Sequence, residues 1–251
     1  MNFVISYYYS KFQNELFEIV QRFDSVGTVL GNEERNIIKL VEFKGKVLNI
    51  KSFKTPNIIN QIAYQYFRKS KASRSFEYAT ILKEKGIGTP DPIAFFELKR
   101  GLGFGQSFYI SEHTIPDLTF RELVHQPDFP NHEDILRAFT RFTFQLHENE
   151  IEFQDHSPGN TLIFIEKSDY KFSLVDLNRM KFKALNFDER MFNFRRLTPK
   201  KEMVKVMSDE YSKLINKSKE EVFKLMWKYT SEFQRKFHLK QKRKQKLKSF
   251  F

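Results

Sequence analysis

Apolar residues recur along this chain with two different periods, and the change of period separates a strand-rich part from a helix-rich part. Short alternating or continuous apolar runs bounded by glycine turns predict strands, whereas apolar residues three and four positions apart predict helices. A short helix is expected first, over residues 10–22. An antiparallel five-stranded sheet follows, with two helices inserted before its fourth strand. The expected strands are residues 26–30, 37–43, 47–53, 93–98 and 107–111, and the inserted helices are residues 57–71 and 73–85.

The second half of the chain has a mainly helical pattern. Residues 132–148 place their apolar side chains on one face, which predicts an amphipathic helix. A hairpin over residues 161–166 and 171–175 follows, and the rest is helical and ends in a basic tail. We therefore predict an α+β chain with two lobes: an N-lobe of sheet and inserted helices over residues 1–111, and a mainly helical C-lobe over residues 112–251.

Composition limits the classes of protein to consider. With 251 residues, 40% hydrophobic and 16% aromatic, the chain can bury a sizeable core. It has no cysteine and no H-E-x-x-H pattern, which excludes disulfides and argues against a zinc site. The net charge of +12 indicates an anionic partner. No signal peptide and no transmembrane helix are expected, so the predicted location is cytoplasmic.

Three polar residues around the predicted hairpin point to phosphoryl transfer. Asp155 is followed five positions later by Asn160, and Asp176 ends the second apolar run of the hairpin. A site of the protein-kinase type needs one carboxylate to orient the hydroxyl that attacks, and an Asn and an Asp to hold Mg²⁺ on the phosphates of ATP. We predict Asp155 as the catalytic residue, and Asn160 and Asp176 as metal ligands. A single Asp is more often a turn residue, so the prediction depends on the order of all three.

Further residues are candidates for binding the nucleotide. Lys51 ends the strand pattern Val-Leu-Asn-Ile-Lys and is expected to reach the phosphates, with Lys54 as competitor and a solvated strand lysine as the plain alternative. Glu77, on the following helix, is the candidate ion-pair partner of Lys51, or an ordinary surface residue. Gly31 is the candidate phosphate-covering glycine, or a plain turn. Glu112 opens the linker, where the neighbouring backbone would face adenine.

Two stretches of this chain resemble the lipopolysaccharide core kinases, which include the Kdo and heptose kinases. Residues 147–162 contain Asp-His-Ser-Pro-Gly-Asn, and residues 175–179 contain Asp-Leu-Asn-Arg in place of the kinase D-F-G. The resemblance covers about residues 35–196. The chain departs from the general H-R-D pattern, because Phe153 and Gln154 occupy the positions of the His and Arg. The missing arginine argues against control by a phosphorylated activation loop.

This resemblance implies a two-lobed protein-kinase-like fold, ATP and Mg²⁺ as cofactors, and a sugar hydroxyl of the lipopolysaccharide inner core as acceptor. It also implies that the reaction takes place at the inner face of the inner membrane. The basic tail, in which eight of the last 17 residues are Lys or Arg, is expected to lie on an anionic membrane surface. A solvated tail and a nucleic-acid contact are its alternatives, although nucleic acid is not an expected partner. Arg190, Arg195 and Arg196 either hold substrate phosphates or cover a helix face.

Two other functions remain open at this point. A RIO-like or related atypical protein kinase also lacks much of the activation segment, and it would phosphorylate protein. A basic kinase-fold scaffold without activity would bind RNA or membrane instead.

Overall fold

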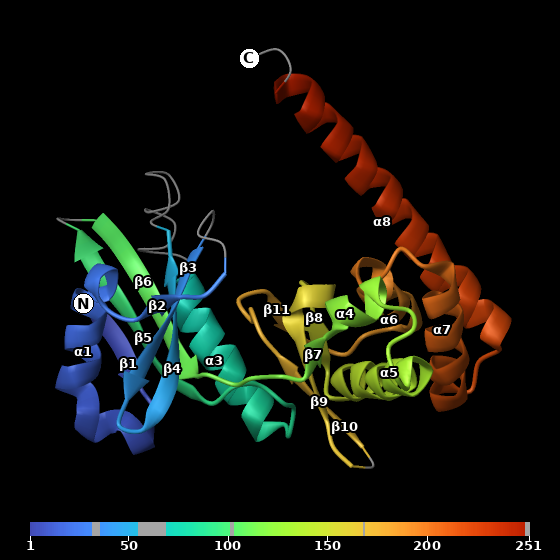
Figure 1. The fold of residues 1–251 in the computed structure, drawn as a ribbon. Helices are drawn as coiled ribbons and strands as arrows, with labels where there is room; N and C mark the ends of the chain where they lie inside the picture. Colours follow the sequence, from blue (N-terminus) through green and yellow to red (C-terminus); the bar gives the residue numbers. More distant parts are fainter. Residues whose placement is uncertain (32–35, 55–68, 101–102, 168, 249–251) are drawn as a thin grey trace. The chain divides into compact units, whose positions relative to one another are not determined.

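The computed structural model describes residues 1–31, 36–54, 69–100, 103–167 and 169–248 (Figure 1). These residues form two compact units. Unit 1 contains Met1–Ile115 together with Asp176–Asn178, and unit 2 contains Pro116–Val175 and Arg179–Phe251. The division falls after residue 115, whereas the sequence suggested residue 111, and the segment at Asp176 returns to unit 1.

Unit 1 is built on an antiparallel sheet of six strands in the order β1-β5-β6-β4-β3-β2. The prediction of five strands was wrong because it missed β1, a four-residue strand that pairs with the distant β5. The hairpin between β3 and β4 turns through Lys44 and Gly45, both with positive φ, which suits the twist of a two-residue hairpin. The strands are β1 Asn2–Ile5, β2 Thr28–Val29, β3 Asn36–Phe43, β4 Lys46–Phe53, β5 Pro92–Arg100 and β6 Gly103–Glu112.

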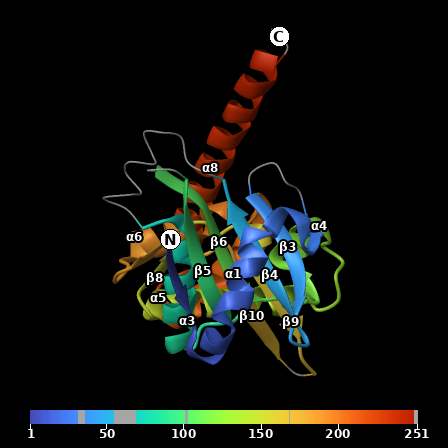
Figure 2. The same ribbon diagram turned by 90° about the vertical axis from the view of Figure 1, so that its left-hand side faces the viewer.

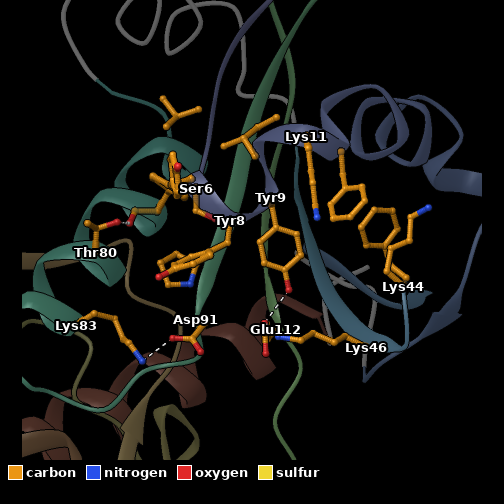
Figure 3. A pocket seen from close by; sticks show the side chains of 17 residues that line it. Ser6, Tyr8, Tyr9, Lys11, Lys44, Lys46, Thr80, Lys83, Asp91 and Glu112 are labelled. Atoms are coloured by element: carbon orange, nitrogen blue, oxygen red, sulfur yellow. Dashed lines mark hydrogen bonds and ion pairs between the residues drawn. The ribbon is translucent and has the colours of Figure 1, made fainter.

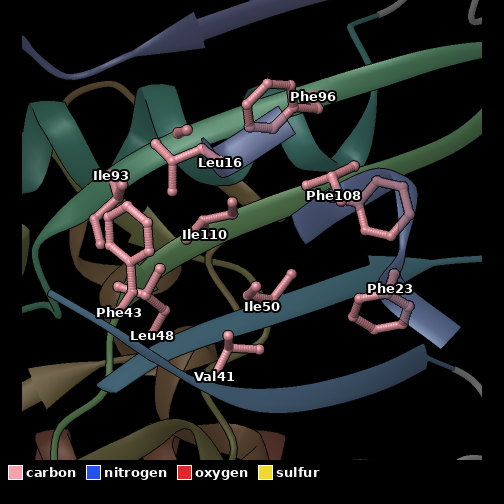
Figure 4. Packing of buried hydrophobic residues seen from close by; sticks show 12 residues of the cluster. Leu16, Phe23, Val41, Phe43, Leu48, Ile50, Ile93, Phe96, Phe108 and Ile110 are labelled. Atoms are coloured by element: carbon pink, nitrogen blue, oxygen red, sulfur yellow. The ribbon is translucent and has the colours of Figure 1, made fainter. Parts of the chain in front are cut away.

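Alternation along β4 separates two clusters of buried residues in unit 1. Leu48 and Ile50 pack in one cluster with Leu16 of helix α1, Gln13–Gln21 (Figure 4). Phe53 belongs to the other cluster, with Ala72 of helix α3, Lys71–Glu84. Because side chains alternate across a strand, Lys51 lies on the side of β4 that faces away from Leu48 and Ile50. Short 3₁₀ turns flank α1 at Tyr7–Phe12 and Phe23–Ser25.

Helix α3 begins where its sequence offers a cap. The Ser70 hydroxyl accepts a hydrogen bond from the backbone N–H of Ser73 at 3.0 Å, as at a typical helix N-terminus. The helix expected over residues 57–71 lies almost entirely outside the described residues.

Unit 2 is assembled around α5, His132–Glu148, which has the predicted bounds. Its apolar face is fully or almost fully buried, including Ile135, Phe139 and Leu146, so the hydrophobic effect is the main force that holds it in place. Two small antiparallel sheets, β10-β9-β7 and β11-β8, carry the loop that follows α5. The elements are β7 Leu118–Thr119, α4 Phe120–His125, β8 Ile151–Phe153, β9 Thr161–Ile165, β10 Tyr170–Leu174, β11 Met180–Phe182, α6 Phe187–Asn193, α7 Lys201–Ile215 and α8 Lys219–Lys248, with 3₁₀ turns at Pro158–Asn160 and Phe194–Arg196.

The last helix has two different halves. Val222, Met226 and Thr230 of α8 are buried, whereas residues 235–247 are exposed. In both views this second half extends away from the other elements of unit 2 (Figures 1 and 2). Within the described part of the chain, no helix combines the length and the apolar character needed to cross a lipid bilayer.

Candidate active site

The loop between β8 and β9 in unit 2 carries the Asp155–Asn160 pair. Asn160 Nδ2 donates to the carbonyl of Asp155 at 2.9 Å, and the Asn160 N–H donates to the carbonyl of Ser157 at 2.9 Å. These bonds close the loop on itself, which fixes the five-residue spacing seen in the sequence. Because the amide nitrogen of Asn160 is used in this way, its oxygen is the atom that suits a metal ion.

Asp155 forms an ion pair that the sequence did not predict. Its Oδ1 accepts a hydrogen bond from Nη1 of Arg196, which also lies 3.4 Å from the carbonyl oxygen of Gln154. The Arg196 guanidinium in turn lies 5.4 Å from the ring centroid of Phe233 on α8. The sequence predicted that Arg196 either holds substrate phosphates or covers a helix face. Neither prediction made it a partner of Asp155. An arginine 41 positions along the chain gives no periodic or motif signal that links it to Asp155.

Buried aromatic packing anchors the same loop. His156, next to Asp155, has no exposed surface and stacks on Phe139 of α5 with ring centroids 5.4 Å apart. Burial, followed by the charges of the neighbouring His147 and Arg195, lowers the pKa of His156 to about 3. His156 is therefore neutral at pH 7 and contributes to the loop as a packed ring.

Gly159 of the Ser-Pro-Gly-Asn stretch lies close to the flexible end of an arginine side chain. A Cβ added there would lie 2.6 Å from Nη2 of Arg121, which comes from α4. That separation is shorter than a van der Waals contact, so the arginine occupies space that any other residue would need. Arg121 is a second residue near the loop that the sequence did not single out.

Unit 1 holds Lys51 and Asp176 together. Nζ of Lys51 lies 2.6 Å from Oδ1 of Asp176, and Asn178 Nδ2 donates to the same oxygen at 2.6 Å. The side chains are 13% and 33% exposed, so the pair is only partly screened by water. Asp176 adopts φ = +59°, a left-handed conformation that is uncommon outside glycine and often marks functional segments.

Glu77 is not the partner of Lys51 in this structure. Both of its carboxylate oxygens accept hydrogen bonds from Nζ of Lys69, at 2.8 and 2.7 Å, while Lys51 pairs with Asp176. The expected Lys51–Glu77 ion pair is corrected accordingly. The physical reason is local, because Lys69 lies just before the Ser70 cap, only eight positions from Glu77.

Gly31 adopts φ = +80° and is exposed, and an added Cβ would meet no described atom within 4 Å. Glycine is therefore favoured at this position by the left-handed backbone conformation of the turn. Residues 32–35, which follow Gly31 in the chain, lie outside the described part, and a phosphate-binding role for Gly31 stays a prediction.

Glu112 lies at a cavity of about 870 Å³ in unit 1 (Figure 3). Its carboxylate accepts a hydrogen bond from the Tyr9 hydroxyl at 2.7 Å and forms an ion pair with Lys46. Burial, followed by the bond to Glu112, raises the pKa of Tyr9. The backbone N–H of Glu112 donates to Asp91 O at 2.9 Å. The Glu112 side chain thus has a structural role here, and the adenine-facing backbone remains a prediction.

The candidate metal ligands are oxygen donors of the kind that Mg²⁺ prefers. Asp176 offers a carboxylate in unit 1, and Asn160 offers an amide oxygen in unit 2. Among the described residues, no three His, Asp or Glu side chains gather into a cluster that would hold a metal by themselves.

Comparison with known proteins adds independent information. Residues 51–229 match the model of the "Lipopolysaccharide kinase (Kdo/WaaP) family". A solved structure described as "WaaP in complex with acyl carrier protein" is similar over 94% of this chain and 98% of that one, with a TM-score of 0.63. Its sequence identity is 16%, so this likeness concerns the fold alone, and it supports the two-lobed kinase-like architecture. No characterised protein in the curated set matches the chain significantly.

Proposed function

Because this chain belongs to the lipopolysaccharide kinase (Kdo/WaaP) family, we propose that it phosphorylates an inner-core sugar, Kdo or heptose, of lipopolysaccharide. The family acts by phosphoryl transfer to sugar hydroxyls, and a kinase of this kind uses ATP. We further propose that Mg²⁺ takes part and that the reaction occurs at the cytoplasmic face of the inner membrane.

The observation that carries the proposal is the closed loop between Asp155 and Asn160. The bond from Asn160 to the Asp155 carbonyl sets the backbone from which both side chains extend. In the proposed reaction, Asp155 accepts or orients the proton of the sugar hydroxyl, and Arg196 holds the Asp155 carboxylate in position. Positioning of this kind is the main contribution of a protein to phosphoryl transfer, since the transition state needs little covalent chemistry from side chains.

Lys51 and Asp176 are the proposed nucleotide-binding residues of unit 1. Their contact at 2.6 Å shows that the ammonium group and the carboxylate converge on one point of that unit. We assign Lys51 to the α- and β-phosphates, and Asp176 with Asn160 to the magnesium ion. When bound, Mg²⁺ neutralises charge that develops on the phosphate oxygens.

The test uses the full chain with Mg²⁺-ATP and purified core glycolipid, with mass spectrometry of the product. The wild-type protein is expected to add one phosphate, and Asp155→Asn is expected to lower kcat by roughly 10²- to 10⁴-fold. Asp128→Asn is the matched control, because Asp128 is an exposed aspartate in the turn before α5. Transfer to a protein substrate but not to glycolipid would favour the atypical protein kinase instead.

The acceptor sugar is assigned by the same assay with two glycolipids. A core that ends at Kdo and a core extended by heptose differ only in the sugar offered. Phosphorylation of the first assigns Kdo, whereas phosphorylation of the second alone assigns heptose. If neither glycolipid is phosphorylated, or if Asp155→Asn retains wild-type kcat, the proposed function is wrong.

A further inference from the structure

The exposed half of α8 carries a dense positive charge. Seven of the thirteen residues from 235 to 247 are Lys or Arg, and no acidic residue follows Glu232. All thirteen side chains are exposed and belong to one continuous helix. At 1.5 Å per residue this segment is about 20 Å long. Such a charge density on a rigid rod requires an anionic partner of comparable extent.

Apolar side chains are placed among these charges on one side of the helix. Phe237, Leu239 and Leu247 are 45%, 51% and 62% exposed. Successive helical residues are about 100° apart, so these three fall within about 160° of one another. Moving these apolar side chains from water into a less polar medium lowers the free energy of the system.

Cations occupy the same side as the apolar residues. Lys236, Lys240 and Lys244 fall inside the arc that contains Phe237 and Leu247. The opposite side carries His238, Gln241 and Gln245 among its residues. Alternating lysines and apolar groups suit the boundary between lipid headgroups and acyl chains, where phosphates meet the ammonium groups and the apolar tips lie deeper.

We propose that residues 235–247 of α8 bind the surface of an anionic phospholipid bilayer, with the Lys236–Lys240–Lys244 side toward the lipid. A nucleic acid would also attract the charges, and its bases would stack on Phe237, but it would leave the aliphatic Leu239 and Leu247 without a favourable contact. The choice of lipid rests on the proposed function, because the acceptor sugar is part of a membrane glycolipid. The helix then concentrates the enzyme on the surface that holds its acceptor.

The test is co-sedimentation of the full chain with vesicles of phosphatidylcholine, with or without phosphatidylglycerol as the anionic lipid. Binding is expected only to the anionic vesicles and is expected to weaken as salt increases. The triple variant Lys236→Gln, Lys240→Gln, Lys244→Gln is expected to weaken partitioning on the order of 10²-fold. Equal binding of the wild-type protein to both kinds of vesicle would overturn the proposal.

A matched control removes the same charge from the other side of the helix. The triple variant Arg235→Gln, Lys242→Gln, Lys246→Gln changes the net charge equally, yet it is expected to weaken partitioning by less than about fivefold. If both triple variants weaken it to the same extent, the proposed orientation is wrong. Leu247→Gln is expected to weaken binding to vesicles but not to a short RNA, because an aliphatic side chain does not stack on bases. An RNA affinity that exceeds the vesicle affinity would also overturn the proposal.

Activity measurements separate this inference from the proposed function. Both triple variants are expected to keep the wild-type kcat on a delipidated core oligosaccharide, because the substituted residues lie outside the predicted active site. Asp155→Asn is expected to bind vesicles normally while losing activity. Loss of vesicle binding with intact kinase activity would therefore be read as a property of α8, and failure of the kinase assay alone would leave the α8 result standing.

Discussion

Two buried histidines are expected to set the acid limit of unit 2. His147 and His156 are 1% and 0% exposed, and burial is the first cause that lowers the pKa of each to about 3. In the unfolded chain both should titrate near their ordinary pKa of 6.5. Because the unfolded state then binds more protons at pH 5, the stability linked to these groups is present above about pH 6.5 and is lost as the pH falls toward 3.

The expected size of the effect follows from those pKa values. Between pH 7 and pH 5, each histidine should lower the free energy of unfolding by about 2 kcal/mol, and the two together by about 4 kcal/mol. That loss is a large fraction of the roughly 5–15 kcal/mol that stabilises a typical domain. A drop from pH 7 to pH 5 is therefore expected to destabilise strongly, without unfolding it in the absence of denaturant, the unit that carries the predicted catalytic loop.

Urea unfolding at pH 7, 6 and 5 measures this loss, and fluorescence of Trp227 reports it. Trp227 is the single tryptophan of the chain and lies on α8 in unit 2. We expect His156→Gln and His147→Gln each to halve the loss of stability between pH 7 and pH 5, whatever their stability at pH 7. His125→Gln is the matched control, since His125 is exposed, and it should keep the wild-type pH dependence.

The pH dependence of the variants shows whether the buried histidines cause the loss of stability. Carboxylates contribute equally to the wild-type protein and to these variants, so they cancel in the comparison. A His156→Gln protein that loses as much stability as the wild type between pH 7 and pH 5 would refute the argument from burial.

Three further predictions concern contacts in unit 2. Arg196→Ala should lower kcat on the order of 10²-fold by releasing the carboxylate of the catalytic loop, and Arg196→Lys should recover part of it in the same steady-state assay; wild-type kcat in the Ala variant would contradict a positioning role. Gly159→Ala should cost less than about 1 kcal/mol in urea unfolding, because the obstructing group is the flexible end of Arg121, and the cost should disappear in an Arg121→Ala background. Hydrogen bonds, first from Arg137, hold the pKa of Asp209 below its usual range, so Asp209→Asn should destabilise the protein by about 1–2 kcal/mol in urea unfolding at pH 7; wild-type stability of this variant would contradict it.

Much of the fold follows from local patterns in the sequence. The bounds of α5 were predictable because its apolar face repeats at the helical period over many residues. The strands β1, β8 and β11 were missed because each is only three or four residues long and gains its partner from elsewhere in the chain, as β1 does from β5. A short strand carries too few alternating positions to distinguish it from a loop.

In the candidate site too, contacts between residues close in the sequence were predictable and contacts between distant residues were not. The Asp155–Asn160 bond joins residues five positions apart, so its spacing is visible in the sequence. Contacts between distant residues leave no such spacing, which is why the Arg196–Asp155 pair was not foreseen. The predicted Lys51–Glu77 pair followed from a kinase-like plan, whereas in the structure Glu77 pairs with Lys69, only eight positions away, and Lys51 pairs with Asp176.

Arg196 also links α8 to the loop that carries Asp155. Protein kinases of the H-R-D type carry an arginine directly before the catalytic aspartate, and Gln154 here offers Arg196 only its carbonyl oxygen at 3.4 Å. The guanidinium that pairs with Asp155 is instead supported on its other side by Phe233 of α8. Phe233 lies just before the basic segment, so the part of α8 that contacts Arg196 and the part that we propose binds lipid are consecutive turns of one helix. A change confined to residues 235–247 leaves the support of Arg196 in place, which is why chemistry and membrane binding can be tested independently.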